Sequence, residues 1–195
     1  MRVAVADYGA GNLRSVCSAF ERAGAEPVVT TDLSEAPLAV IAGVGNAASA
    51  ACELELRGLA DQLRERVATG RPLFGICLGM QLLFGESEEG GSGLGLLDGE
   101  VVRLRARQVP HMGWNALTLT GASAVRDGLD GEDVYFAHSY GAETDEAVVA
   151  TVEHEGPVVA AVERGALAGV QFHPERSGAA GAKILENVLR WSSAA

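Results

Sequence analysis

The stretch around Cys77 constrains the fold more than any other part of the sequence. Residues 72–76 are a short apolar run that predicts a buried strand, and residues 78–84 are apolar at helical spacing. Cys77 therefore falls on the turn between a strand and a helix, with Gly75 and Gly79 on either side. Glycines tolerate a tight, strained turn that lifts a nucleophile clear of a sheet, as in the Gly-x-Ser-x-Gly elbow. The pattern predicts an α/β fold with Cys77 at its sheet edge.

Two interpretations of Cys77 stand side by side. A helix N-terminus directly behind the sulfur favours a thiolate nucleophile. A buried free cysteine also packs as a small hydrophobe. The three cysteines are an odd number at irregular spacing, which does not suit a disulfide framework or a metal site. We therefore interpret Cys17 and Cys52 as reduced fillers and expect no metal.

The composition narrows the class of protein. A chain of 195 residues suits a single domain, 1–195, and 48% hydrophobic with 21% charged residues is typical of an α/β protein with a well-covered sheet. A net charge of -11 without clustered Lys and Arg argues against a nucleic-acid surface. The N-terminus lacks the apolar region of a signal peptide, and no stretch reads as a membrane span. These observations predict a cytoplasmic protein.

The N-terminal half alternates predicted strands and helices. Strands are expected at residues 2–6, 27–30, 38–42 and 72–76, with helices at 12–23 and along a stripe of Leu56, Leu59, Leu63 and Val67. Ligands of open α/β sheets bind beyond the carboxyl ends of the strands. The turn Gly43-Val44-Gly45, which follows the third strand, is therefore expected to face the edge that carries Cys77.

The C-terminal half changes to short β-like runs after a polar, glycine-rich loop at 86–93. The runs are residues 101–104, 114–119, 134–137, 148–152, 158–163 and 167–172, and a closing helix is expected at 178–191. We predict a mixed sheet with a parallel core, an antiparallel extension and helices on both faces.

A glycine-rich turn at residues 7–11 raises a nucleotide-binding alternative, with Asp32 where a ribose-binding acid would lie. Arg14 occupies the position of the third glycine, where close strand–helix packing tolerates no side chain. We therefore expect no cofactor.

His173 and Glu175 end the last predicted strand two residues apart. In an extended backbone, which Pro174 favours, both side chains point to one face. A carboxylate behind a histidine fixes its tautomer, so His173 is the candidate base for Cys77. The plainer interpretation is a satisfied histidine at a strand end.

Side by side, Gly75-Ile-Cys77-Leu-Gly-Met-Gln81 and Gln171-Phe-His173-Pro-Glu175 resemble the motifs of class I (triad) glutamine amidotransferases. Residues 7–15, 110–115 and 135–140 are similar to the glutaminase subunits of imidazole glycerol phosphate synthases, and the likeness runs nearly end to end. The resemblance implies a flavodoxin-like core. It also implies hydrolysis of L-glutamine and passage of ammonia to a cyclase subunit of (β/α)₈ fold in a heterodimer for L-histidine biosynthesis.

The resemblance also implies roles for individual residues. Cys77 would attack the glutamine carboxamide, His173 would move the proton, and Glu175 would orient His173. Glutamine binding and the oxyanion would fall to Gln81, Glu89, the Ser139 and Tyr140 backbone, the Leu78 N–H and the turn Gly43-Val44-Gly45. Asn12, Trp114, Tyr135 and Arg176 would lie towards the cyclase.

The sequence departs from the family pattern at Ala42, where the family usually has proline before Gly-Val-Gly, and Asn46-Ala47-Ala48 replaces the usual aromatic-containing continuation. Two alternatives stay open. One is a glutaminase of another synthase, such as the anthranilate or pyridoxal phosphate system, against which residues 110–115 argue. The other is a catalytically silent subunit of the same fold.

Overall fold

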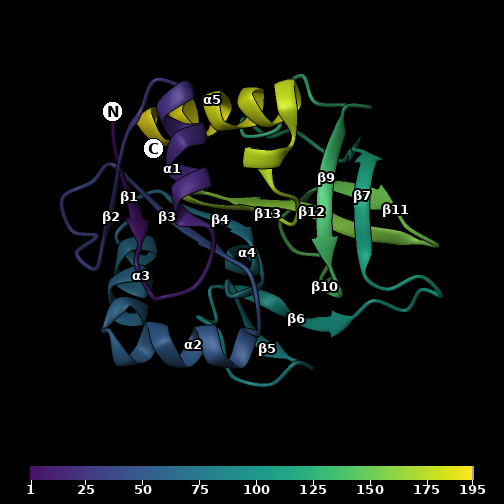
Figure 1. Ribbon diagram of the computed structural model, residues 1–195, viewed down its shortest axis with the longest axis horizontal. Helices are drawn as coiled ribbons and strands as arrows, with labels where there is room; N and C mark the ends of the chain where they lie inside the picture. The colour runs from purple at the N-terminus through teal and green to yellow at the C-terminus, as the bar shows by residue number, and fades with distance from the viewer. Residues whose placement is uncertain (195) are drawn as a thin grey trace.

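The computed structural model describes residues 1–194, and the parallel core lies in their N-terminal half (Figure 1). Its strands are β1 (Arg2–Ala6), β2 (Glu26–Thr30), β3 (Leu38–Gly43) and β4 (Leu73–Cys77), in the order β2-β1-β3-β4. All neighbours in this group pair in parallel. Every residue of β3 and β4 is buried, which is why both strands read as unbroken apolar runs. The four predicted core strands are confirmed.

The sheet continues with the predicted antiparallel extension. The added strands are β13 (Leu167–Val170), β12 (Pro157–Arg164), β11 (Val148–Glu153) and β8 (Thr118–Leu119). β13 pairs in parallel with β4, with Gly169 opposite Gly75, and the strands beyond it are antiparallel. Within residues 1–194 this mixed sheet has eight strands.

Two smaller sheets lie beside the carboxyl end of β4. One contains β5 (Phe84–Ser87), β6 (Leu97–Arg103) and β10 (Tyr140–Glu143), and the other pairs β7 (His111–Ala116) with β9 (Asp133–His138). The predicted run 114–119 is divided between β7 of the two-stranded sheet and β8 of the large sheet. β10 has no counterpart among the predicted strands.

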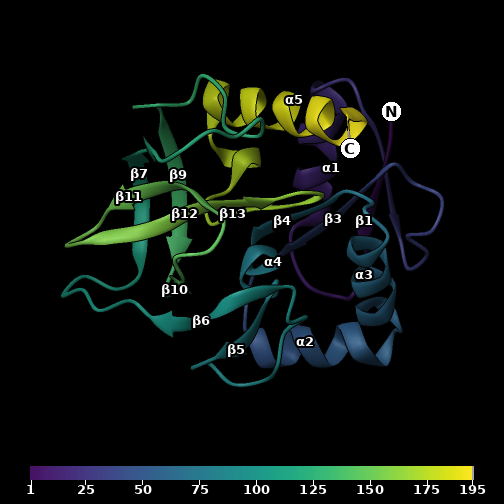
Figure 2. The same cartoon turned by 180° about the vertical axis from the view of Figure 1, so that it is seen from behind.

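Helices cover both faces of the large sheet, as predicted (Figures 1 and 2). α1 (Leu13–Arg22) and α5 (Gly178–Ala194) lie on one face and bury Phe20 and Val188 there. α2 (Ala47–Leu56) and α3 (Leu59–Ala68) lie on the other and bury Leu54 and Leu59. In residues 1–194 there is no helix with the length and apolar character needed to cross a bilayer.

The prediction that Leu56, Leu59, Leu63 and Val67 form one stripe on a single helix is wrong. The chain ends α2 at Leu56 and starts α3 at Leu59, because Gly58 adopts a left-handed conformation with φ of 65°. Leu56 is consequently 74% exposed, whereas Leu59 and Leu63 are buried as expected.

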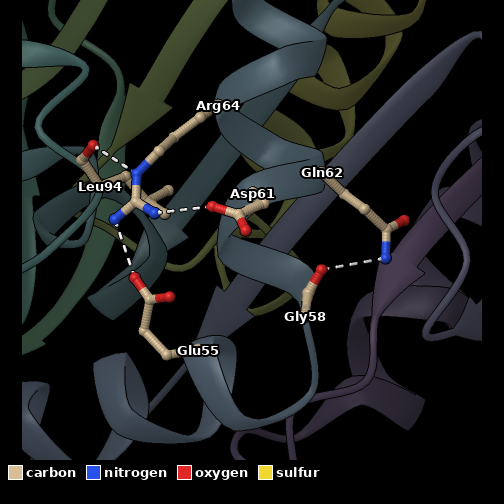
Figure 3. A network of polar contacts seen from close by, with 6 residues as sticks. All are labelled: Glu55, Gly58, Asp61, Gln62, Arg64 and Leu94. Atoms are coloured by element: carbon tan, nitrogen blue, oxygen red, sulfur yellow. Dashed lines mark hydrogen bonds and ion pairs between the residues drawn. The ribbon is translucent and has the colours of Figure 1, made fainter.

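Arg64 reinforces this break from the next turn of α3 (Figure 3). Its guanidinium donates to Glu55 Oε1 at 2.9 Å and to the Leu94 carbonyl at 3.2 Å, so it ties α2 to the loop after β5. Gln62 Nε2 donates to the Gly58 carbonyl at 3.2 Å. Such contacts are partly exposed, so each adds only modest stability.

The helix after Cys77 is also shorter than predicted. α4 covers only Leu78–Gln81, and β5 begins at Phe84. The carbonyls of Leu82 and Leu83 accept from the N–H groups of Leu94 and Leu96 at 2.8 Å, so they do not continue a helix. This pairing holds the following loop, residues 86–93, beside the edge that carries Cys77.

Candidate active site

Cys77 ends β4 with φ of 53° and ψ of -109°, a strained backbone for a residue with a side chain. The strain lies on the cysteine itself, since φ is not left-handed at Gly75 or Gly79. A Cβ atom at Gly79 would lie 2.0 Å from the Ile41 carbonyl oxygen, and one at Gly75 would lie 2.7 Å from the Gly79 oxygen. The predicted turn is confirmed, but the glycines are needed for close packing of α4 on the sheet.

His173 follows β13 and forms a buried pair with Glu175. His173 Nδ1 lies 2.8 Å from Glu175 Oε1, and the side chains are 6% and 7% exposed. The backbone of His173 is extended, but Pro174 starts the 3₁₀ helix η1 (Pro174–Arg176). The predicted extended backbone through Pro174 is therefore wrong, although the predicted contact between the two side chains is present.

The proton affinity of His173 reflects competing effects. Burial lowers its pKa, but hydrogen bonding to Cys77 and to Glu175, together with their negative charge, outweighs burial and raises the pKa to about 10. His173 therefore holds a proton at neutral pH, which it can transfer to a leaving group. Its own backbone N–H donates to the Tyr135 carbonyl at 2.9 Å, which joins the segment after β13 to β9.

Gln171 is a functional candidate that the sequence patterns did not single out. It is fully buried, and its Nε2 lies 3.6 Å from Cys77 Sγ. Its Oε1 accepts from Gln81 Nε2 at 3.0 Å, and the same nitrogen donates to the Tyr140 carbonyl at 2.7 Å. The available signal was its spacing, two residues before His173 along an extended chain. Both N–H bonds of Gln81 are used inside the protein, so only its oxygen is free for a ligand.

A pocket of about 230 Å³ opens over Cys77. It brings together eight residues predicted for the site, namely Val44, Gly45, Cys77, Leu78, Gln81, Glu89, Ser139 and Tyr140. Pro110, Met112, Ala137 and His138 complete the wall, and sequence patterns assigned none of them to the site. Glu89 Oε2 accepts the Ala47 N–H at 2.6 Å, which anchors the 86–93 loop to the start of α2.

The predicted oxyanion turn rests on the first βα turn. The Tyr8 hydroxyl donates to the Ala42 carbonyl at 3.1 Å, and a Cβ atom at Gly43 would lie 2.0 Å from that hydroxyl oxygen. A Cβ atom at Gly11 would lie 2.8 Å from the Ala42 carbonyl oxygen. The glycine-rich turn considered for nucleotide binding is thus packed against the chain's own backbone. Gly43 is buried and does not line the pocket with Val44 and Gly45.

Comparison with known proteins decides the family. The profile of the family "Glutamine amidotransferase class-I" matches residues 4–191. This chain belongs to the class I glutamine amidotransferases. The amidotransferase is 47% identical over 198 residues to the imidazole glycerol phosphate synthase subunit HisH of Mycolicibacterium paratuberculosis, with 95% of each chain covered. It is 43% identical over 194 residues to the HisH subunit of Methanothermobacter thermautotrophicus, covering 96% of this chain and 97% of the relative.

Solved structures agree with the amidotransferase fold. A crystal structure of a glutamine amidotransferase superposes with a TM-score of 0.79 at 22% identity, covering 98% of each chain. The structure of PurLQS from Thermotoga maritima gives a TM-score of 0.78 at 22% identity, covering 97% of this chain and 98% of that chain. At these identities the likeness establishes the fold alone.

Four residues were predicted to face the partner, and three of them, Trp114, Tyr135 and Arg176, lie together on the surface of the amidotransferase. Trp114 is 57% exposed and meets the Tyr135 ring edge-on at 6.0 Å between centroids. The Arg176 guanidinium lies 4.1 Å above the Tyr135 ring. Asn12 is exposed and caps α1, its Oδ1 accepting the Ser15 N–H at 3.4 Å. Contact of any of them with a cyclase stays a prediction.

Proposed function

We propose that this chain is the glutaminase subunit of an imidazole glycerol phosphate synthase, which hydrolyses L-glutamine to glutamate and ammonia in L-histidine biosynthesis. The observation that carries the proposal is Cys77 on a strained turn, hydrogen-bonded to His173 of the buried His173–Glu175 pair. Relatives of that name match the chain nearly end to end. The solved structures that share the fold are less similar in sequence, at 22% identity.

The chemistry follows from the three side chains. The Cys77 sulfur attacks the carboxamide carbon of glutamine, and the carbon–nitrogen bond of the tetrahedral intermediate then breaks. Ammonia leaves with a proton from His173, and a thioester remains on Cys77. Water then gives a proton to His173 and attacks the thioester carbon, which breaks the carbon–sulfur bond and releases glutamate. Glu175 orients His173 and stabilises its charged form throughout.

Backbone groups around the pocket support the reacting atoms. The Leu78 N–H and the turn Gly43-Val44-Gly45 would donate to the oxyanion. Glu89, Ser139 and Tyr140 would hold the amino-acid end of glutamine. A carboxylate has more acceptor positions than the one used by the Ala47 N–H, so Glu89 can still accept from the substrate ammonium.

The exposed aromatic cluster would form part of the contact with a (β/α)₈ cyclase in a heterodimer, through which ammonia reaches the second reaction. Met112 is 63% exposed next to Trp114 and lines the pocket over Cys77, so a partner placed there would also close the pocket. Aromatic residues, Met and Arg are the types enriched at protein interfaces.

Glutamate release by the purified chain tests the proposal, measured alone and with a cyclase subunit carrying its acceptor ligand. We expect stimulation of about 100-fold, because hydrolysis without an acceptor wastes glutamine, and this factor requires about 2.7 kcal/mol of differential binding. Equal rates with and without the cyclase would contradict the coupling. If the complex never hydrolyses glutamine, this chain is a catalytically silent subunit. If only the partner subunit of another synthase stimulates glutamine hydrolysis, the chain serves that synthase instead.

A further inference from the structure

Two buried histidines, one of them in the pocket wall and the other behind it, have no part in the mechanism above. His138 on β9 and His111 on β7 stand opposite each other in the antiparallel pair and are 6% and 4% exposed. His138 lines the pocket together with Cys77. Buried polar side chains need hydrogen-bond partners, so their bonds reveal what they hold in place.

The hydrogen bonds of this pair have a fixed direction. His138 Nδ1 lies 2.8 Å from the Tyr140 carbonyl oxygen, and since a carbonyl only accepts, Nδ1 carries the hydrogen. Burial lowers the pKa of His138 to about 4, so the ring is neutral and its Nε2 is an acceptor. His111 Nδ1, at 3.1 Å, is then the donor to that nitrogen. His111 Nε2 in turn accepts from Asn115 Nδ2 at 3.3 Å.

Asn115 sets this direction at the outer end. Its Nδ2 also donates to the Glu153 carbonyl at 2.8 Å, and its Oδ1 accepts the Ala116 N–H at 2.9 Å. Turning the amide over would place a donor against a donor and an acceptor against an acceptor. The hydrogen bonds of this series therefore all run inward, from Asn115 through the two rings to the Tyr140 carbonyl.

Stacking fixes the plane of the middle ring. The His111 ring is stacked between two others. Its centroid lies 4.5 Å from that of Phe136, with 18° between the ring planes, and 4.1 Å from that of His154, with 21° between the planes. A ring held on both faces cannot rotate away from His138. His154 itself bonds to the Gln108 carbonyl at 2.8 Å, outside the hydrogen-bonded chain.

The hydrogen-bonded series ends at Tyr140, which lines the pocket together with Ser139. The Tyr140 carbonyl accepts from both His138 and Gln81, so the start of β10 is held by two donors. The Ser139 carbonyl accepts the Leu104 N–H at 2.9 Å from behind. Without His138, the Tyr140 carbonyl would keep only the Gln81 side chain of its two donors, beside the pairing of β10 with β6.

The geometry points to His138, oriented by His111, as a positioning residue for glutamine binding. It holds the Tyr140 carbonyl, and through it the Ser139–Tyr140 backbone, in the orientation that receives the amino-acid end of the substrate. This inference rests on the proposed function. Loss of the Nδ1 donor should therefore raise KM for glutamine and leave the chemical step nearly unchanged.

Steady-state glutaminase kinetics of the stimulated cyclase complex test the inference. His138→Leu should raise KM for glutamine about tenfold and keep kcat within about twofold, whereas His138→Asn, whose amide nitrogen lies near the Nδ1 position, should recover most of the loss. His154→Phe is the matched control, because it keeps an aromatic ring stacked on His111 and removes only the bond to the Gln108 carbonyl, outside the hydrogen-bonded series. Its KM should match that of the unsubstituted protein.

An unchanged KM in a folded His138→Leu protein would overturn the inference, as would equal KM values for the Leu and Asn variants. If the Leu variant does not fold, His138→Gln replaces it, since its amide reaches the Nε2 position and leaves Tyr140 without the donor. Calorimetry with glutamine on a Cys77→Ala background must show the same order of affinities. An unsubstituted complex without glutaminase activity would instead refute the proposed function.

Discussion

At Ala42 the buried hydroxyl of Tyr8 holds the last carbonyl before the turn that would bind the oxyanion. Burial, and to a lesser extent the charge of Cys77, raises the pKa of Tyr8, so its hydroxyl stays protonated as a donor at any ordinary pH. The tether acts on the carbonyl side of residue 42 only. The φ angle of Ala42 is restrained only by the pairing of β3 with β4, whereas the proline usual in the family would fix it near -65°.

We predict that Ala42→Pro lowers the partner-free glutaminase rate about fivefold and leaves the stimulated complex within about twofold. Proline also biases Ile41 towards extended geometry, so the resting turn is held more firmly, and about 1 kcal/mol of restraint shifts a population by that factor. Ala42→Gly, which loosens the same position, should change the partner-free rate in the opposite direction. Glutamate release by the isolated subunits measures both, and a rate that rises or stays constant with proline would contradict the account.

The residues that could be predicted from the sequence are those with a local pattern. Cys77 stands out because a strand run and a helical run meet there, and His173 with Glu175 because they are two apart at a strand end. Gln171 reaches the Cys77 sulfur from just beyond the end of β13, and Gly79 is needed because the Ile41 carbonyl passes beneath it. These contacts join distant parts of the chain, so no local periodicity reports them.

At the scale of elements, burial patterns predicted strands better than helix ends. β3 and β4 are apolar throughout because both of their faces are covered. α4 ends early because residues 94 and 96 capture carbonyls that would otherwise continue it, and that competition comes from a loop over ten residues away. Because α4 is short, the 86–93 loop can lie beside the pocket, where Glu89 forms part of the lining.

The β7–β9 pair should make the fold sensitive to mild acid. Burial lowers the pKa of His111 and of His138 to about 4, so the unfolded chain, in which histidine titrates near 6.5, binds more protons below that pH. Their stabilising contribution is present above pH 6.5 and is lost as the pH falls towards 4. His173 has a raised pKa, so its contribution is fully present below 6.5 and does not oppose this loss.

We therefore predict that the free energy of unfolding falls by about 2 kcal/mol for each neutral histidine between about pH 7 and about pH 5. Urea unfolding at several pH values measures the slope. His138→Asn should flatten the slope by roughly half, while His154→Phe, which keeps a ring stacked on His111, should preserve it. A stability independent of pH in this range would show that the two rings accept protons freely in the folded protein.

At the scale of the whole molecule, the site lies where the three sheets meet. Cys77 comes from β4, Met112 from β7, His138 from β9 and Tyr140 from β10. The alternation of strands and helices predicted the large sheet and its covered faces. The small sheets depend on pairing across long separations, such as β10 with β6, and short apolar runs do not specify which partner each strand takes.

The most direct test of the account is the ammonia bypass in a complex of Cys77→Ala with its cyclase. We predict that glutamine supports no synthesis, because the thioester cannot form, while ammonium salts support the cyclase reaction at the rate of the unsubstituted complex. Cys17→Ala and Cys52→Ala, which change cysteines away from the pocket, should keep glutamine-dependent synthesis. Synthesis from glutamine by the Cys77→Ala complex would contradict the assignment of Cys77 as the nucleophile.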